Sequence, residues 1–330
     1  MPLSRGSIAI MNETTARKAF ITGLQGMDGK ILAQILVARG YEVSGMVRSD
    51  PGTNRLPGVD YMIGDLSDGN SIGDVLRQSN PDEIYNLGAQ SAIAPSWESP
   101  YYTLEVNGTA IVHLLDYIRK DSPRTKLFNA ASSEMFGFPS ESPQVEQTKM
   151  HPRNPYGAAK VYAHNMIRLY REKYGIFACS GILYNHECES RDIKMVSRKI
   201  SNGIAEISLG MRDELELGNL DAVRDWGYAP DYCDAMQVIL QHEAADDYIV
   251  SSGVARTVRD FLDSAFQTVG IGSWDSYVRI NPDFVRPVEQ NALVGDNSKL
   301  RSIGWTPKVS FDDMVRKMVQ ADIDRLNQKA

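Results

Sequence analysis

Short apolar runs alternate with amphipathic stretches along the first half of the chain. Residues 18–22 contain Ala-Phe-Ile directly before a glycine-rich turn, which is typical of a buried strand. Residues 29–40 repeat apolar positions at helical spacing and stop at Gly40, and residues 41–47 return to a strand pattern. This order predicts a strand–helix–strand unit of a parallel sheet.

The same alternation continues to about residue 190. Further strands are expected at 61–66, 83–87, 127–130 and 176–183, with the clearest helices at 110–119 and 158–174. Beyond that point the alternation weakens, and helices are expected at 198–209 and 311–326. The predicted fold class is α/β: a Rossmann-like doubly wound parallel sheet with a smaller C-terminal α/β substrate-binding domain.

The pattern also suggests where the domains divide. Residues 1–17 are expected to be a flexible N-terminal leader, in which Met11 could be the native start. Residues 18–185 are expected to form the Rossmann domain, with a later segment near 225–255 returning to it. Residues 186–330 would then be mostly the substrate-binding domain. A ligand cleft would lie between the two, above the carboxyl ends of the strands.

Composition narrows the class of protein. The 330 residues are 42% hydrophobic and 23% charged, as in soluble globular enzymes. A net charge of −7 disfavours binding to nucleic acid or an anionic membrane, and no apolar run reaches the roughly 20 residues of a membrane helix. The three cysteines are far apart, which indicates a reducing compartment, so we expect a cytoplasmic protein. No cluster has metal-ligand spacing, so no metal is expected.

The glycine-rich turn after the first strand has the pattern Gly23-x-x-Gly26-x-x-Gly29. Between a strand and a helix, such glycines permit a tight turn and close approach of the backbone to a pyrophosphate at the helix N-terminus. The turn therefore predicts a dinucleotide site. The expected contacts within it include Gln25, Met27 and Asp28.

The ends of the next strands refine this cofactor prediction. The second strand ends in Val-Arg48-Ser rather than in an acidic residue, and an arginine there suits the 2′-phosphate of NADP better than the ribose of NAD. Further cofactor contacts are expected after the third and fourth strands, near the adenine and the ribose-pyrophosphate respectively: Asp65 and Leu66, then Leu87, Ala89 and Gln90.

Tyr156 and Lys160 lie four residues apart at the start of a predicted helix, so their side chains share one side of it. A phenol with an ordinary pKa of about 10 is a poor base near neutrality, and a nearby ammonium together with the charge of a nicotinium would favour the phenolate. Upstream, Ser132 ends a predicted strand and could hydrogen-bond the reacting oxygen. Together with the glycine turn, these residues predict hydride chemistry at a carbinol.

Glu134, two residues beyond that serine, separates the possible reactions. A simple dehydrogenase or 4-epimerase needs no carboxylate there. A 4,6-dehydratase does, because a 4-keto sugar must lose its C5 proton before water leaves C6.

Several runs in order resemble the extended short-chain dehydrogenase/reductases and, among them, the GDP-mannose 4,6-dehydratases. The resemblance covers about residues 18–325. Its most specific runs are 21–29, 85–91, 131–134, 152–160, 181–187, 218–227 and 284–289.

The resemblance implies a reaction and roles for the catalytic residues. Tyr156 would take the C4 hydroxyl proton, Ser132 would steady the C4 oxygen, and Glu134 would remove the C5 proton. Hydride would pass from C4 to NADP and back to C6, converting GDP-mannose to GDP-4-keto-6-deoxymannose. Lys160 would hold the nicotinamide ribose.

Further binding residues follow by position from the same resemblance. His186 and Arg191 would contact the cofactor. The nucleotide-sugar would be held by Ser91, Asn185, Lys199, Gly218, Arg224, Arg286 and Glu289.

The resemblance also implies a homodimer through helices near 110–119 and 158–174, and possibly a tetramer. The loop at 188–192 departs from the family pattern, which puts the tetramer in doubt. Ala92 and Asn291 also differ from the family, and Ser49 replaces a second arginine.

Three alternatives remain open. A GDP-heptose 4,6-dehydratase would keep Glu134 and differ only in the sugar pocket. A GDP-4-keto-6-deoxyhexose reductase would consume NADPH and have no use for that carboxylate. A non-enzymatic cofactor-sensing module would have no need of the Tyr156–Lys160 pair.

Overall fold

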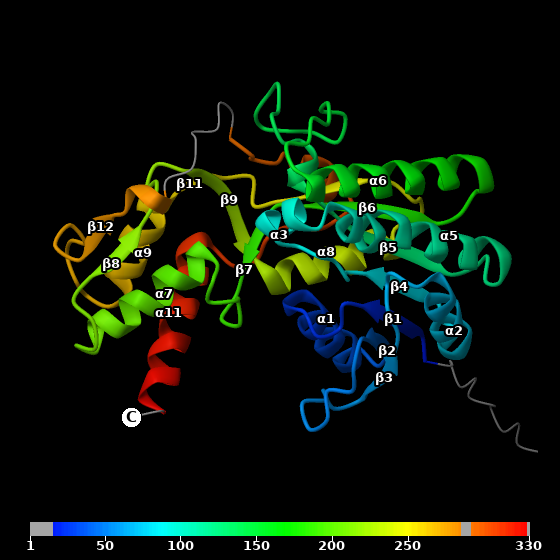
Figure 1. Cartoon of the computed structure of the whole chain (residues 1–330), viewed down its shortest axis with the longest axis horizontal. Coiled ribbons are helices and arrows are strands. Elements are labelled where there is room, and N and C mark those ends of the chain that lie inside the picture. Colours follow the sequence, from blue (N-terminus) through cyan, green and yellow to red (C-terminus); the bar gives the residue numbers. More distant parts are fainter. Residues whose placement is uncertain (1–15, 285–291, 329–330) are drawn as a thin grey trace, which may run out of the picture.

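In the computed structural model, which describes residues 16–284 and 292–328, a seven-stranded parallel sheet forms the larger lobe (Figure 1). Its strand order is β10-β6-β5-β4-β1-β2-β3, so the first six strands have the order of a dinucleotide-binding fold. The strands are β1 (Lys18–Thr22), β2 (Glu42–Val47), β3 (Val59–Ile63), β4 (Glu83–Asn86), β5 (Lys126–Ser132), β6 (Ala178–Leu183) and β10 (Tyr248–Val250). The α/β prediction is confirmed.

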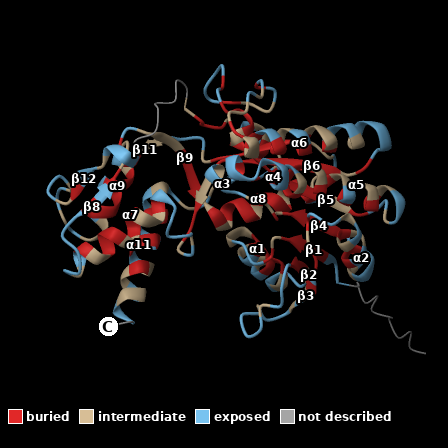
Figure 2. Cartoon of the chain, in the orientation of Figure 1, coloured by how far each residue is buried: buried red, intermediate tan, exposed pale blue. Residues whose placement is uncertain are grey.

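Helices cover both faces of this sheet. On one face, the strands' apolar side chains pack with α1 (Met27–Ala38) and α8 (Ala229–Gln241). On the other, they pack with α2 (Gly69–Ser79), α5 (Ala110–Lys120) and α6 (Pro155–Tyr174). Figure 2 shows the strands buried between these two layers. Because all seven strands are parallel, their carboxyl ends lie at the same edge of the sheet.

One long helical segment departs from the predicted pattern. The helix expected at 110–119 is preceded without a break by α4 (Pro100–Leu104) and a π-helical turn, η1 (Glu105–Thr109). A π turn shifts the register of the helix by one residue and is often found at functional sites. The short α3 (Ile93–Glu98) leads into this segment.

The smaller lobe contains a separate apolar core beneath three helices (Figure 1). Its helices are α7 (Val196–Ser208), α9 (Val258–Thr268) and α11 (Phe311–Asn327), with the short α10 (Ser298–Ser302) returning to the larger lobe beside β10. Its strands are β7 (Asn185–Glu187), β8 (Leu215–Leu217), β9 (Val223–Tyr228), β11 (Ala255–Thr257) and β12 (Val278–Ile280), in sheets of order β11-β9-β7 and β12-β8. Single turns η2 (Ser133–Met135) and η3 (Pro282–Phe284) follow β5 and β12.

The segment near 225–255 spans both lobes. Its first strand, β9, pairs with β7 and β11, whereas α8 packs against α1 and β10 pairs with β6 in the large sheet. Positions 1–15 of the predicted leader at 1–17 lie outside the described residues. No helix in the described ranges is long and apolar enough to cross a membrane.

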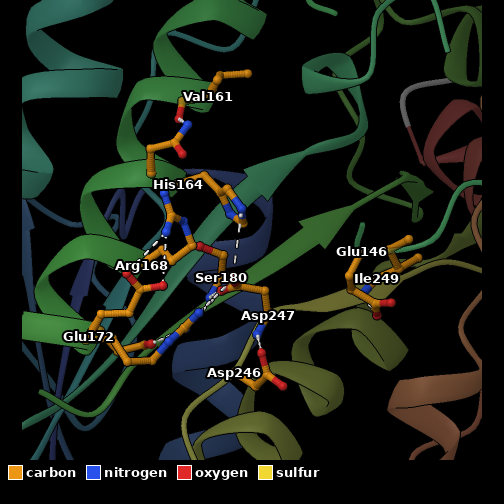
Figure 3. Close-up of polar contacts among 12 residues, drawn as sticks. Glu146, Val161, His164, Arg168, Glu172, Ser180, Asp246, Asp247 and Ile249 are labelled. Carbon is orange, nitrogen blue, oxygen red and sulfur yellow. Dashed lines mark hydrogen bonds and ion pairs between the residues drawn. The ribbon is translucent and has the colours of Figure 1, made fainter. Parts of the chain in front are cut away.

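A buried ion pair ties α6 to the edge of the large sheet (Figure 3). Arg171 donates to Asp247 through both terminal nitrogens, at 3.1 and 2.8 Å, and Asp247 also accepts the Ser180 backbone N–H at 3.0 Å. His164 Nε2 lies 3.9 Å from the same carboxylate. The helix that bears Tyr156 and Lys160 is thus held on strands β6 and β10.

Candidate active site

The glycine turn between β1 and α1 is closely packed. Gly23 has φ +72°, and a Cβ on it would lie 2.7 Å from the Gly88 Cα. A Cβ on Gly29 would lie 2.3 Å from the Gly23 carbonyl oxygen, so the helix packs directly on the turn. Gly26 is the N-cap of α1 and offers no side chain to its first-turn amides. These amides and the positive end of the helix dipole fit a diphosphate.

Gly88, just after β4, is a turn residue that sequence reasoning missed. Its N–H donates to the Thr22 hydroxyl at 3.0 Å, and a Cβ on it would lie 2.5 Å from the Leu66 side chain. Leu66, Gly88 and Gly23 therefore meet at the carboxyl edge of the sheet, with Leu87 and Ala89 half-buried beside them.

The other predicted cofactor residues differ in how they are held. Arg48 is exposed at the end of β2. The Asp65 carboxylate accepts the backbone N–H and hydroxyl of Ser67, each at 2.9 Å. Gln90 is fixed by its backbone, because Asn107 in the π turn donates to its carbonyl and accepts its N–H, both at 2.8 Å. Ser91 is exposed.

The structure brings three predicted catalytic residues together between β5 and α6. Ser132 ends β5, and its hydroxyl hydrogen-bonds the Tyr156 phenol. Lys160 is buried one helical turn beyond the tyrosine, donates to the Ala130 carbonyl at 2.7 Å and lies 5.8 Å from the phenol ring centroid. Burial lowers the pKa of Lys160 to about 8, which keeps it largely protonated at neutral pH.

Taken together, the groups of the chain itself do not lower the pKa of the phenol. Burial raises the pKa of Tyr156 to about 12, the Ser132 hydrogen bond and Arg191 lower it, and Glu134 and Asp28 raise it. Lys160 is not among these main influences, because its Nζ points to the strand carbonyl rather than to the phenol oxygen. The chain's own residues alone therefore favour the neutral phenol.

Glu134 is positioned by the N-cap of the catalytic helix. The Asn154 side chain accepts the Gly157 N–H at 2.7 Å, as an N-cap does, and its amide nitrogen donates to Glu134 Oε2 at 2.9 Å. Arg153 Nε lies 3.9 Å from the same oxygen. A Cβ on Gly157 would lie 2.5 Å from the Glu134 carbonyl oxygen, so only a glycine lets η2 approach α6 this closely.

Four charged side chains meet where β7 approaches the first turn of α1. His186 Nε2 lies 2.9 Å from Asp28 Oδ2, and Arg191 Nε lies 2.9 Å from Glu187 Oε2. Arg191 also contacts Met27, with Nη1 4.0 Å from the sulfur. The predicted cofactor residues Met27, Asp28, His186 and Arg191 thus form one cluster.

The predicted substrate residues other than Ser91 lie in the smaller lobe, and those that the structure describes form two groups. Asn185 and Arg224 lie on the paired strands β7 and β9. Lys199 lies 4.4 Å from the Phe284 ring centroid, and a Cβ on Gly218 would lie 2.4 Å from the Phe284 carbonyl oxygen. Arg286, Glu289 and Asn291 follow Phe284 but lie outside the described residues.

Sequence reasoning missed two asparagines of this site. Asn154 had a readable signal, because asparagine directly before proline is a common start for a helix. Asn107 had none, because a π turn leaves no periodic mark in a single sequence.

Comparisons with known proteins place the chain in a family. The profile of the family described as "GDP-mannose 4,6 dehydratase" matches residues 20–318. The Arabidopsis thaliana protein "GDP-mannose 4,6 dehydratase 1" is 43% identical over 326 residues, which cover 93% of this chain and 90% of that protein.

Two solved structures share the fold. RMD from Pseudomonas aeruginosa, complexed with NADPH, has a TM-score of 0.78 at 22% identity and covers 94% of this chain and 100% of its own. The dTDP-glucose 4,6-dehydratase from Bacillus anthracis, in complex with NAD, has a TM-score of 0.79 at 18% identity, with coverages of 95% and 98%. By its family profile and its plant relative, the chain belongs to the GDP-mannose 4,6-dehydratase family.

Proposed function

We propose that this chain converts GDP-D-mannose to GDP-4-keto-6-deoxy-D-mannose, with a tightly held NADP as an internal hydride carrier. The observation behind this proposal is the Glu134 carboxylate, fixed by Asn154 at 2.9 Å and close enough to Tyr156 to raise the pKa of the phenol. A dehydrogenase or reductase on the same fold has no step that requires a carboxylate there.

In this proposal each catalytic side chain moves or steadies one proton. Tyr156 accepts the C4 hydroxyl proton, and Ser132, already bonded to the phenol, hydrogen-bonds the C4 oxygen. Once C4 is a ketone, Glu134 removes the acidified C5 proton and delivers it to the departing C6 hydroxyl, which leaves as water. C5 then takes up one proton, which balances the proton that Tyr156 took from O4.

The chemistry supplied by a bound nicotinamide is hydride acceptance from C4 and hydride return to C6, without net redox. Lys160, buried and held on the Ala130 carbonyl, would orient the ribose. Arg48 is exposed just after β2, at the position where an acidic residue would bind the ribose of NAD. An arginine there suits the 2′-phosphate of NADP, so Arg48 favours NADP over NAD.

The nucleotide end of the substrate would lie in the smaller lobe. Arg224 and Arg286 suit a diphosphate, and Lys199 beside Phe284 adds a third cation. Asn185, Gly218 and Glu289 would complete this site, with Ser91 near the sugar. The protein would act in the cytoplasm as a homodimer through α5 and α6, or as a tetramer.

The test is turnover of GDP-mannose by the purified protein with catalytic NADP+. The sugar is followed by mass spectrometry and the reduced cofactor by its absorbance. Loss of one water from the sugar, without accumulating NADPH, is the expected result. An unchanged mass for GDP-mannose together with dehydration of a GDP-heptose would move the assignment to the heptose, and stoichiometric NADPH consumption with a 4-keto sugar would make the protein a reductase.

A further inference from the structure

Both ring nitrogens of His186 face groups that can only accept a hydrogen bond. Nδ1 lies 2.7 Å from the Tyr184 carbonyl oxygen, and Nε2 lies 2.9 Å from Asp28 Oδ2. A neutral imidazole carries one N–H and cannot donate to both. The geometry therefore describes a doubly protonated imidazolium.

This imidazolium links the two lobes at the cofactor turn. His186 belongs to β7, Asp28 to the first turn of α1, and the His186 ring stacks on Tyr232 of α8 with centroids 4.8 Å apart. Only 12% of the His186 side chain and 22% of the Asp28 side chain is exposed. The second carboxylate oxygen of Asp28, Oδ1, is buried and has no hydrogen-bond partner among the described residues.

Asp28 poses an electrostatic problem for cofactor binding. An anion stabilises the N-terminus of a helix, but here the same turn must receive a diphosphate, and two anions in a poorly solvated site repel. Arg191 also acts on Asp28, but it is paired with Glu187 at 2.9 Å, whereas His186 both faces Asp28 and hydrogen-bonds it. His186 is thus the cation that offsets Asp28.

We propose that His186 is a positioning residue that acts through Asp28: as an imidazolium it cancels the carboxylate's charge at the dinucleotide turn, and its deprotonation weakens cofactor binding. This inference rests on the proposed function for the identity of the dinucleotide. Asp28 and the Tyr184 carbonyl raise the pKa of His186 against the opposing effect of burial, which extends the imidazolium form toward higher pH.

Other titratable or charged groups face the His186–Asp28 pair from each of the elements that pack against it. They are Glu187, Cys188 and Arg191 after His186, Tyr232 and Cys233 on α8, and Tyr156 on α6. Burial raises the pKa of Cys188, Cys233 and Tyr232, and burial also raises the pKa of Tyr156, so these groups stay neutral while His186 loses its proton. Lys160 in the catalytic site, whose pKa burial lowers to about 8, also loses its proton in this range. The histidine therefore accounts for the part of the alkaline pH dependence that His186→Gln removes.

The experiment measures NADPH affinity by fluorescence titration between about pH 7 and pH 9.5, without any sugar. Wild-type protein should bind at least about tenfold more weakly at the alkaline end, which corresponds to about 1.4 kcal/mol. His186→Gln should bind more weakly at pH 7 and lose most of the alkaline decline, keeping only the part that comes from Lys160. Asp28→Asn should bind tightly at pH 7 with the same residual decline, and the double variant should recover most of the affinity lost in His186→Gln.

Several results would overturn the proposal. They are a wild-type pH profile in His186→Gln, no recovery in the double variant, or a ¹⁵N spectrum of labelled protein at pH 7.5 with a neutral His186 ring. Half-buried His242, at the far end of α8, provides the matched control, and His242→Gln should leave the profile unchanged. If His186→Gln does not fold, Asp28→Asn alone still decides the matter. A protein that binds no dinucleotide would instead refute the proposed function.

Discussion

Asp247→Ala removes the carboxylate that anchors the catalytic helix. The wild-type side chain accepts two hydrogen bonds from Arg171 and one from the Ser180 backbone, and the residue is 8% exposed. In the variant, the Arg171 guanidinium, which is only 17% exposed, keeps its hydrogen bond to the Ala178 carbonyl at 2.8 Å but loses its counter-ion. The Ser180 N–H loses the carboxylate that accepts it. Removing one partner of a buried pair typically costs about 3–5 kcal/mol, so this loss of folding free energy is expected.

The assay is urea unfolding followed by far-UV circular dichroism and by tryptophan fluorescence, because a two-lobed chain has to be tested for two-state behaviour. The matched control is Glu172→Ala on the same helix, which breaks the exposed Arg168–Glu172 pair of 2.9 Å (Figure 3). Such a pair contributes about 0.3–0.5 kcal/mol. An Asp247→Ala variant within about 1 kcal/mol of wild type, or no less stable than the control, would refute the argument that this pair holds α6.

Three further predictions test other parts of the structure. Gly157→Val introduces a Cβ that would lie 2.5 Å from the Glu134 carbonyl oxygen, so it should displace Glu134. Turnover should fall at least about a hundredfold while NADPH still binds, and unchanged turnover would refute this close approach. Burial lowers the pKa of His164, so below about pH 6.5 the unfolded chain binds more protons than the folded chain. The free energy of unfolding, measured with urea, should therefore fall as the pH drops through this range. The fall should be smaller in His164→Gln. Arg48→Asp should shift the ratio of NADP to NAD affinities toward NAD by at least about tenfold in parallel titrations, and an unchanged ratio would remove Arg48 from cofactor choice.

Local patterns in the sequence were enough to predict the parallel sheet and the catalytic spacing. The glycine turn precedes α1 as expected, and four residues along one helix place Tyr156 and Lys160 on the same side. The predicted helix at 158–174 begins earlier, at Pro155, because Asn154 caps it. These features depend on residues a few positions apart, which a single sequence displays.

The remaining features depend on contacts between distant residues. Asp28 and His186 are 158 positions apart, and nothing local pairs them. The direction of the Lys160 ammonium could not be read from the sequence for a similar reason, because it donates to the Ala130 carbonyl on another element. The domain boundaries, the choice of NADP and the assembly of subunits remain predictions.

The role of Glu134 is the central claim, and a single-turnover experiment with Glu134→Gln tests it most directly. The variant, loaded with NADP+ and mixed with GDP-mannose, should oxidise C4 and stop: the reduced-nicotinamide absorbance should rise and persist, and the sugar should lose two hydrogens but no water. Steady turnover should fall by about 10²–10⁴-fold, the usual contribution of a general acid–base group. Loss of water from the sugar at the wild-type rate would contradict the account.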